Sequence, residues 1–106
     1  MKLLTLNQLT DHDVYEFCYN TNYPNNWNEN SLFLNSDDLV FLSPYIDKVF
    51  SNFHYYGPQK ITIAQWLTIK DLCLLDKPNY SKFFDTIDDW LHCDPKKCDF
   101  FWLLGI

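Results

Sequence analysis

Residues 62–75, TIAQWLTIKDLCLL, decide the fold more clearly than any other stretch of the chain. Thr62 and Gln65 have the spacing of a capping box, in which each side chain accepts a hydrogen bond from the backbone of the other residue. The apolar residues that follow occupy too many positions for one narrow stripe: Ile63, Trp66, Leu67, Ile69, Leu72, Cys73 and Leu74. The pattern therefore predicts a helix over residues 63–75 at the buried centre of the molecule.

Start signals on both sides of this stretch predict further helices. Thr10 can cap a helix with an acidic first turn, since Val14, Phe17 and Cys18 follow at helical spacing. The Ser43-Pro44 pair is typical of a helix start, and an apolar face follows at Ile46, Val49, Phe50 and Phe53. Residues 37–53 are thus either a turn at Ser36-Asp37-Asp38 followed by a helix, or one helix kinked at Pro44. Asn79 is expected to cap a last helix, whose inner face carries Phe83, Phe84, Ile87, Trp90 and Leu91.

The remaining stretches contain loops and short extended pieces. Residues 20–31 hold six asparagines around a proline, which is typical of a loop, and Gly57-Pro58 ends the preceding helix. Residues 32–34 and the first ten residues can form short strands, and the apolar tail 100–106 is either a strand or a final helical turn. The expected fold is mainly α: a compact single-domain helical bundle over residues 1–106, with short strands at its two ends.

Composition limits the functions open to the chain. With 106 residues, 47% of them hydrophobic, it is long enough for one buried core and too apolar to be disordered. All eight cations are lysines and the formal charge is −6, which disfavours direct binding of nucleic acid and favours a basic partner. No apolar stretch approaches the roughly 20 residues of a membrane span. No export signal is apparent at the first residues, so we expect a cytoplasmic location.

The sequence offers little catalytic chemistry. With only Gly57 and Gly105 as glycines, the chain cannot form a phosphate-cradling loop. His92, Cys93 and Cys98 could contribute to a zinc site, but they lack a Cys-x-x-Cys pair and a clear fourth ligand. We therefore expect no enzyme activity, no cofactor and no metal.

Carboxylates and exposed aromatic rings are the candidate binding residues. Asp85, Asp88 and Asp89 share one helix face, which is either a docking stripe for a basic partner or an ordinary solvated face. Two further acidic groups, Asp37 with Asp38 and Asp11 with Asp13 and Glu16, shift the balance toward a macromolecular partner. Tyr23 and Trp27 in the asparagine loop are candidate anchors, because tyrosine and tryptophan are frequent at the energetic centres of protein interfaces.

Three stretches carry a resemblance to a known class of protein. They are Tyr55-Tyr56-Gly57-Pro58-Gln59-Lys60-Ile61-Thr62-Ile63 with Trp66, then residues 83–91, FFDTIDDWL, and the ending 99–106, DFFWLLGI. They resemble small bacterial immunity proteins encoded beside polymorphic or contact-dependent growth-inhibition toxins. The resemblance covers residues 55–106 and does not extend to residues 1–54.

The resemblance implies a cytosolic protein that binds the C-terminal toxin domain of a cognate effector and blocks its active site or substrate surface. Such toxins are often nucleases with basic clefts, which an acidic inhibitor would complement. Asp85, Asp88, Asp89, Asp37, Asp38, Tyr23 and Trp27 are the residues expected to contact the toxin. The alternative is a phage-type acidic inhibitor that mimics nucleic acid against a defence nuclease.

Overall fold

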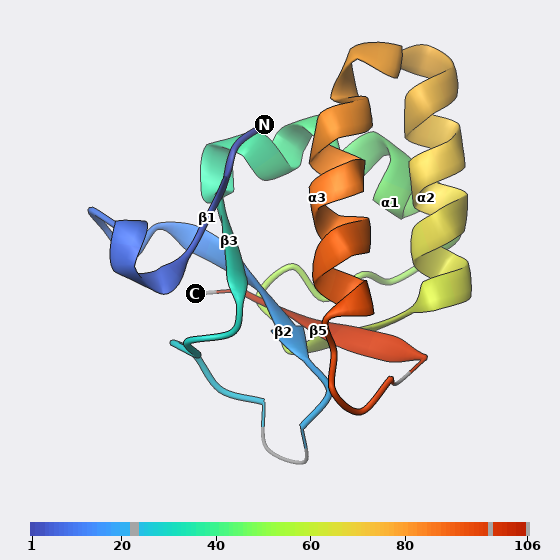
Figure 1. The fold of residues 1–106 in the computed structure, drawn as a ribbon. Coiled ribbons are helices and arrows are strands. Elements are labelled where there is room, and N and C mark those ends of the chain that lie inside the picture. Colours follow the sequence, from blue (N-terminus) through green and yellow to red (C-terminus); the bar gives the residue numbers. More distant parts are fainter. Residues whose placement is uncertain (22–23, 98, 106) are drawn as a thin grey trace.

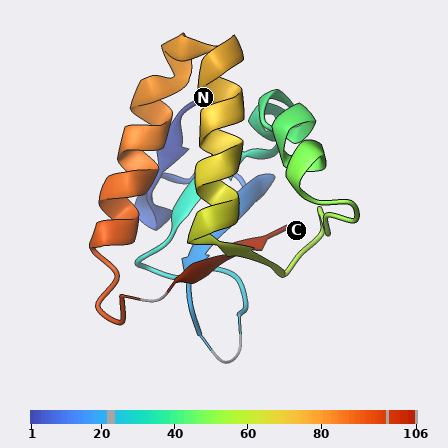
Figure 2. The same cartoon turned by 90° about the vertical axis from the view of Figure 1, so that its right-hand side faces the viewer.

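The protein folds around a five-stranded antiparallel sheet in the computed structural model, which describes residues 1–21, 24–97 and 99–105. The strands are β1 (Leu3–Leu4), β2 (Val14–Tyr19), β3 (Leu32–Asn35), β4 (Gln59–Thr62) and β5 (Phe100–Leu104), in the spatial order β1-β3-β2-β5-β4. Three α-helices, α1 (Ser43–Val49), α2 (Ile63–Asp76) and α3 (Ser81–His92), lie over one face of this sheet (Figures 1 and 2). Three short 3₁₀ helices, η1 (Leu6–Gln8), η2 (Ser36–Phe41) and η3 (Pro78–Tyr80), complete the elements.

The expectation of a mainly α bundle is therefore wrong, and the chain has a mixed α/β fold. The decisive error lies at residues 14–19, which form the central strand β2 and not a helix. Glu16, Phe17 and Cys18 are consecutive and all buried, so β2 lacks the polar–apolar alternation by which a strand is usually identified. Asp11 does not open a helix either, because its Oδ1 accepts a hydrogen bond from the Asp13 amide in a local turn.

The helix predicted from the capping box is confirmed. Thr62 and Gln65 form both reciprocal hydrogen bonds at the start of α2, at 2.9 and 3.1 Å. The same Thr62 ends strand β4, so the sheet leads into the helix without a loop. The break at Pro44 is also real, since η2 ends at Phe41 and α1 begins at Ser43.

Other helix boundaries differ from the expectation. Asn35, and not Ser36, caps η2, because its Oδ1 accepts a hydrogen bond from the Asp37 amide at 2.9 Å. The α1 helix ends at Val49, short of Phe53. Asn79 lies inside η3, and α3 begins at Ser81 without a side-chain cap. The apolar tail, which the sequence left open, is strand β5.

Aromatic rings fill the core between the sheet and the helices. Phe17 of β2 lies edge-on to Trp66 of α2, with ring centroids 5.8 Å apart, and Trp66 meets Phe101 of β5 in the same geometry at 5.6 Å. Trp90 of α3 also contacts Phe101 edge-on, at 5.9 Å. Such contacts stabilise a core beyond the area they bury. Many of the aromatic rings of the chain are therefore used inside the molecule.

The only two glycines of the chain lie against each other. Gly57 has a φ of +62°, and a Cβ there would lie 2.7 Å from the backbone of Leu103 and Gly105. A Cβ on Gly105 would lie 2.5 Å from the Tyr55 carbonyl oxygen. The turn before β4 and the end of β5 therefore pack backbone to backbone, which no larger residue permits.

Candidate interaction surfaces

The carboxylates of α3 do project from one side of the helix, as their spacing predicts. Asp85 and Asp89 are exposed, whereas the Asp88 carboxylate accepts a hydrogen bond from the Lys70 ammonium of α2 at 2.7 Å. Hydrogen bonding to Asp88 raises the pKa of Lys70, so the ammonium stays charged next to the stripe. One member of the expected docking stripe is therefore used to join α2 to α3, and the same lysine also interacts electrostatically with Asp85.

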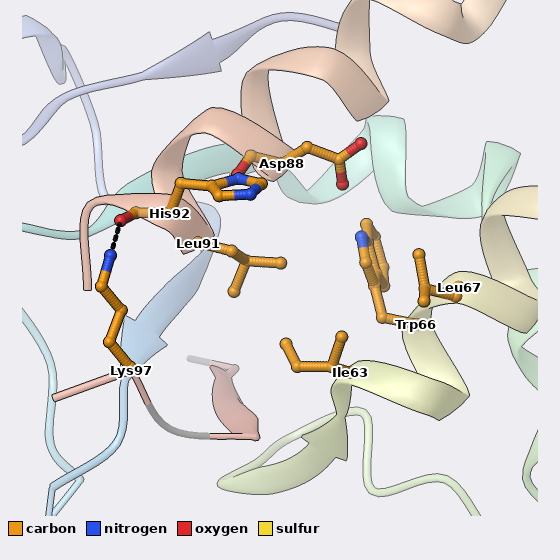
Figure 3. A pocket seen from close by; sticks show the side chains of 7 residues that line it. All are labelled: Ile63, Trp66, Leu67, Asp88, Leu91, His92 and Lys97. Carbon is orange, nitrogen blue, oxygen red and sulfur yellow. Dashed lines mark hydrogen bonds between the residues drawn. The ribbon is translucent and has the colours of Figure 1, made fainter.

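A cavity of about 390 Å³ opens beside this stripe, between α2 and α3 (Figure 3). Ile63, Leu67 and Leu91 form apolar walls, and Asp88, His92 and Lys97 lie toward the rim. The rim groups already have partners: His92 Nδ1 lies 2.7 Å from the Asp88 carbonyl, and Lys97 Nζ donates to the His92 carbonyl. The cavity therefore offers mainly apolar contact to anything that binds α3.

Asp37 and Asp38 lie on η2, in a different acidic region. The Ser36 amide donates to the Asp13 carbonyl at 3.0 Å, so the start of β2 and the start of η2 are adjacent. Asp47 follows on α1 and accepts a hydrogen bond from the Tyr55 hydroxyl at 2.6 Å. Sequence reasoning missed Asp47 and Tyr55 as neighbours of this group, because both belong to later segments of the chain, α1 and the turn before β4.

Trp27 lies on the far side of the sheet from the helices. Its ring is 37% exposed and stacks between His12, at 4.5 Å, and Phe33 of β3, at 5.9 Å. Its φ of +84° is unusual for a tryptophan, so the loop holds it in a strained position. The other expected anchor, Tyr23, lies outside the described residues.

A buried glutamate holds this loop in place. Glu16 is 1% exposed, so the expectation that it belongs to a solvent-facing acidic group is wrong. Its two oxygens accept hydrogen bonds from the Trp27 and Asn28 amides, the Asn28 side chain and the Ser31 hydroxyl, over 2.6–3.2 Å. The asparagine loop is thus anchored to the sheet by a charge-assisted network.

The expected binding residues therefore divide among three separate surfaces. In Figure 2, α2 stands between α3 on one side and the η2–α1 segment on the other, and α1 packs on α2. Trp27 lies on the opposite face of the sheet from α3 and from the η2–α1 segment. A partner that contacts one flat surface cannot use all of these residues together.

Two sequence hypotheses concern metals and membranes. Cys93 is an exposed free thiol, and Cys98 lies outside the described residues. Within residues 1–21, 24–97 and 99–105, no three histidine, cysteine or acidic side chains are grouped as a metal ion requires. None of the helices in the described part of the chain has the length and apolar composition to span a bilayer.

Comparisons with known proteins do not assign this chain to a family. No protein-family model matches the sequence, and no curated protein or solved structure was found to be similar to it.

Proposed function

We propose that this chain is an immunity protein, which binds the toxin domain of a neighbouring effector in the cytoplasm and blocks its active site or substrate surface. The toxin domain is basic, and a nuclease with a cationic cleft is the kind of target that an acidic inhibitor complements. The resemblance of residues 55–106 to such proteins suggested this class, and the distribution of charge supports it independently.

The observation that carries the proposal is an imbalance between the two halves of the chain. Residues 59–106 hold six lysines and seven acidic residues, so they are nearly neutral. Residues 1–58 hold two lysines against seven acidic residues, and of these only Glu16 is buried. Most of the excess negative charge therefore belongs to this half of the chain. Asp13, Asp37, Asp38 and Asp47 lie on or next to η2 and α1, where their electric field can steer a basic partner and speed its association.

The proposal is tested by toxicity and rescue. The reading frame next to the gene for this chain is expressed from a tightly regulated promoter, with the chain supplied from a second plasmid. We expect the frame alone to arrest growth and the chain to restore it. A neighbouring frame that does not arrest growth, or arrest that persists with the chain in excess, would contradict the proposal.

A direct binding measurement complements the growth assay. The purified toxin domain should bind the chain with an affinity that falls as salt is raised, because screening weakens attraction between exposed charges. If a pull-down instead captures a host defence nuclease, the chain is an acidic inhibitor of the alternative kind, and the immunity proposal fails.

A further inference from the structure

A groove of about 360 Å³ lies where η2 and α1 face the start of β2 and the turn before β4. We name it the Tyr15–Tyr55 groove after two of its lining residues, which include Tyr15, Ser36, Val40, Ser43, Asp47 and Tyr55. None of the residues expected from the sequence to contact a partner lines it, although Asp37 and Asp38 follow directly after Ser36. The groove therefore adds a concave surface to the most acidic side of the molecule.

The two tyrosines present neutral rings to the groove. Burial raises the pKa of the Tyr15 hydroxyl, and the nearby Tyr56 and Asp13 raise it further. Burial and the hydrogen bond to Asp47 raise the pKa of Tyr55 as well. Both phenols thus remain protonated well above neutral pH, and their ring faces keep the electron-rich character that attracts cations.

Carboxylates surround the groove with few cations to balance them. Asp47 forms part of its wall, Asp13 lies close enough to Tyr15 to shift its pKa, and Asp37 is exposed on η2. The nearest lysine along the chain, Lys48, has its ammonium 5.8 Å from the ring of Tyr45. In the described part of the chain none of these three carboxylates forms an ion pair with a lysine. Their charge is available to a ligand.

Val40 adds an apolar contact at the rim. Its side chain is among the most exposed hydrophobic groups of the molecule, and Phe41 next to it is also exposed. A surface that combines tyrosine rings, an exposed aliphatic side chain and unneutralised carboxylates is suited to a long side chain that is apolar along its stem and cationic at its tip.

We infer that the Tyr15–Tyr55 groove receives an arginine of a basic segment of the toxin domain, and this inference rests on the proposed function. A guanidinium is planar and can stack on a tyrosine ring while it donates to a carboxylate in two parallel bonds. Asp47 can accept a guanidinium hydrogen bond at Oδ2, the oxygen that Tyr55 does not use, and Asp37 lies on the adjoining element. The α3 stripe lacks this combination, since Lys70 occupies its central carboxylate.

The first test needs no toxin. The ¹⁵N-labelled full chain is titrated with the peptide acetyl-Gly-Arg-Gly-Arg-Gly-amide, and separately with the same peptide carrying citrulline, which is neutral and close in shape to arginine. We expect amide shift changes centred on Ser36, Val40 and Asp47 with arginine and none with citrulline. Equal responses to both peptides, shifts centred on α3, or no response to arginine would overturn the inference.

The second test compares two variants of equal charge. Asp37→Asn with Asp47→Asn removes two charges at the groove, while the side-chain amide oxygen introduced at position 47 can still accept the hydrogen bond of the Tyr55 hydroxyl. Asp85→Asn with Asp89→Asn removes two charges from α3. We expect the groove variant to weaken binding of the toxin domain about tenfold or more, and the α3 variant less than about threefold.

The outcomes separate the inference from the proposed function. If the toxin domain binds and the α3 variant is the weaker one, or both variants weaken equally, the groove inference fails and the immunity function stands. If no toxin domain binds the wild-type chain, the function fails, and the peptide titration alone decides whether the groove recognises arginine.

Discussion

Replacing Glu16 with glutamine should destabilise the protein, although the two side chains have nearly the same shape. One carboxylate oxygen accepts three hydrogen bonds, from the Asn28 amide, the Asn28 side chain and the Ser31 hydroxyl, and the other accepts one from the Trp27 amide. All four partners are donors. A glutamine can offer its oxygen to only one of these two sets, and its NH₂ group must then face a donor.

The size of the effect follows from these contacts. If the amide oxygen takes the position with three donors, each of those bonds loses about 1 kcal/mol of charge assistance, and the unpaired Trp27 amide costs about 1 kcal/mol more. The amide is cheaper to bury than a carboxylate, which offsets roughly 1 to 2 kcal/mol of the loss. We expect a net loss of about 2–3 kcal/mol from a total stability on the order of 5–15 kcal/mol.

Urea unfolding and amide hydrogen exchange together measure this loss. The midpoint of unfolding should fall, and the amides of Trp27 and Asn28 should exchange faster than in the wild type. Glu29→Gln is the matched control, because Glu29 is an exposed glutamate of the same loop and its replacement should change stability by less than about 0.5 kcal/mol. A loss below about 1 kcal/mol for Glu16→Gln, with exchange at both amides unchanged, would refute the assigned role of the network.

Three further predictions concern other parts of the fold. Gly105→Ala should cost about 3 kcal/mol or more, because the new Cβ would lie 2.5 Å from the Tyr55 carbonyl oxygen; a thermal melt that matches the wild type would contradict this. Asp88→Lys should cost about 1 kcal/mol in urea unfolding, since it replaces the partner of Lys70 with a like charge, whereas exposed Asp89→Lys should change stability by less than about 0.5 kcal/mol. Burial raises the pKa of Tyr19 to about 12 and also raises the pKa values of Tyr15 and Tyr45, while the hydrogen bond to Asp88 raises the pKa of Lys70. The contribution of Tyr19 to stability is therefore complete below about pH 10 and lost as the pH rises toward about 12, and Tyr19→Phe should make the fall in circular dichroism over this range shallower.

Local signals in the sequence were reliable where the local hydrogen bonds decide the structure. The capping box at Thr62 and Gln65 needs only residues three positions apart, and it is present in the fold. The break before α1 follows in the same way from Pro44. In both places the structure depends on residues only a few positions apart, so it can be predicted without knowledge of the remaining chain.

The sheet could not be predicted in the same way, because its partners are far apart in sequence. Strand β2 pairs with β5 through contacts such as Phe17 with Leu103, more than eighty positions later. Its second face is covered by the asparagine loop, so residues that would be polar in a half-exposed strand are buried. Glu16 shows the consequence: counted with Asp11 and Asp13 as surface charge, it is instead the anchor of the loop.

Because Glu16 is buried, the surface charge that can attract a partner comes from other carboxylates. A partner within a Debye length, about 8–10 Å in physiological salt, responds to the net charge of the surface in front of it, and not to a row of carboxylates taken alone. On α3, the Lys70 ammonium of α2 pairs with Asp88 and interacts with Asp85, which weakens the field of the stripe. Around η2 and the Tyr15–Tyr55 groove, Asp13, Asp37 and Asp47 form no ion pair with a lysine within the described residues.

Kinetic measurements can separate steering from contact on these two surfaces. If the groove holds an arginine, Asp47→Asn should mainly raise the rate of dissociation from the toxin domain, because the lost group touches the bound side chain. Asp11→Asn, at an exposed position outside the groove, should mainly lower the rate of association at low salt and have little effect at high salt. If both variants changed only the association rate, the η2 side would attract the partner without forming the site that binds it.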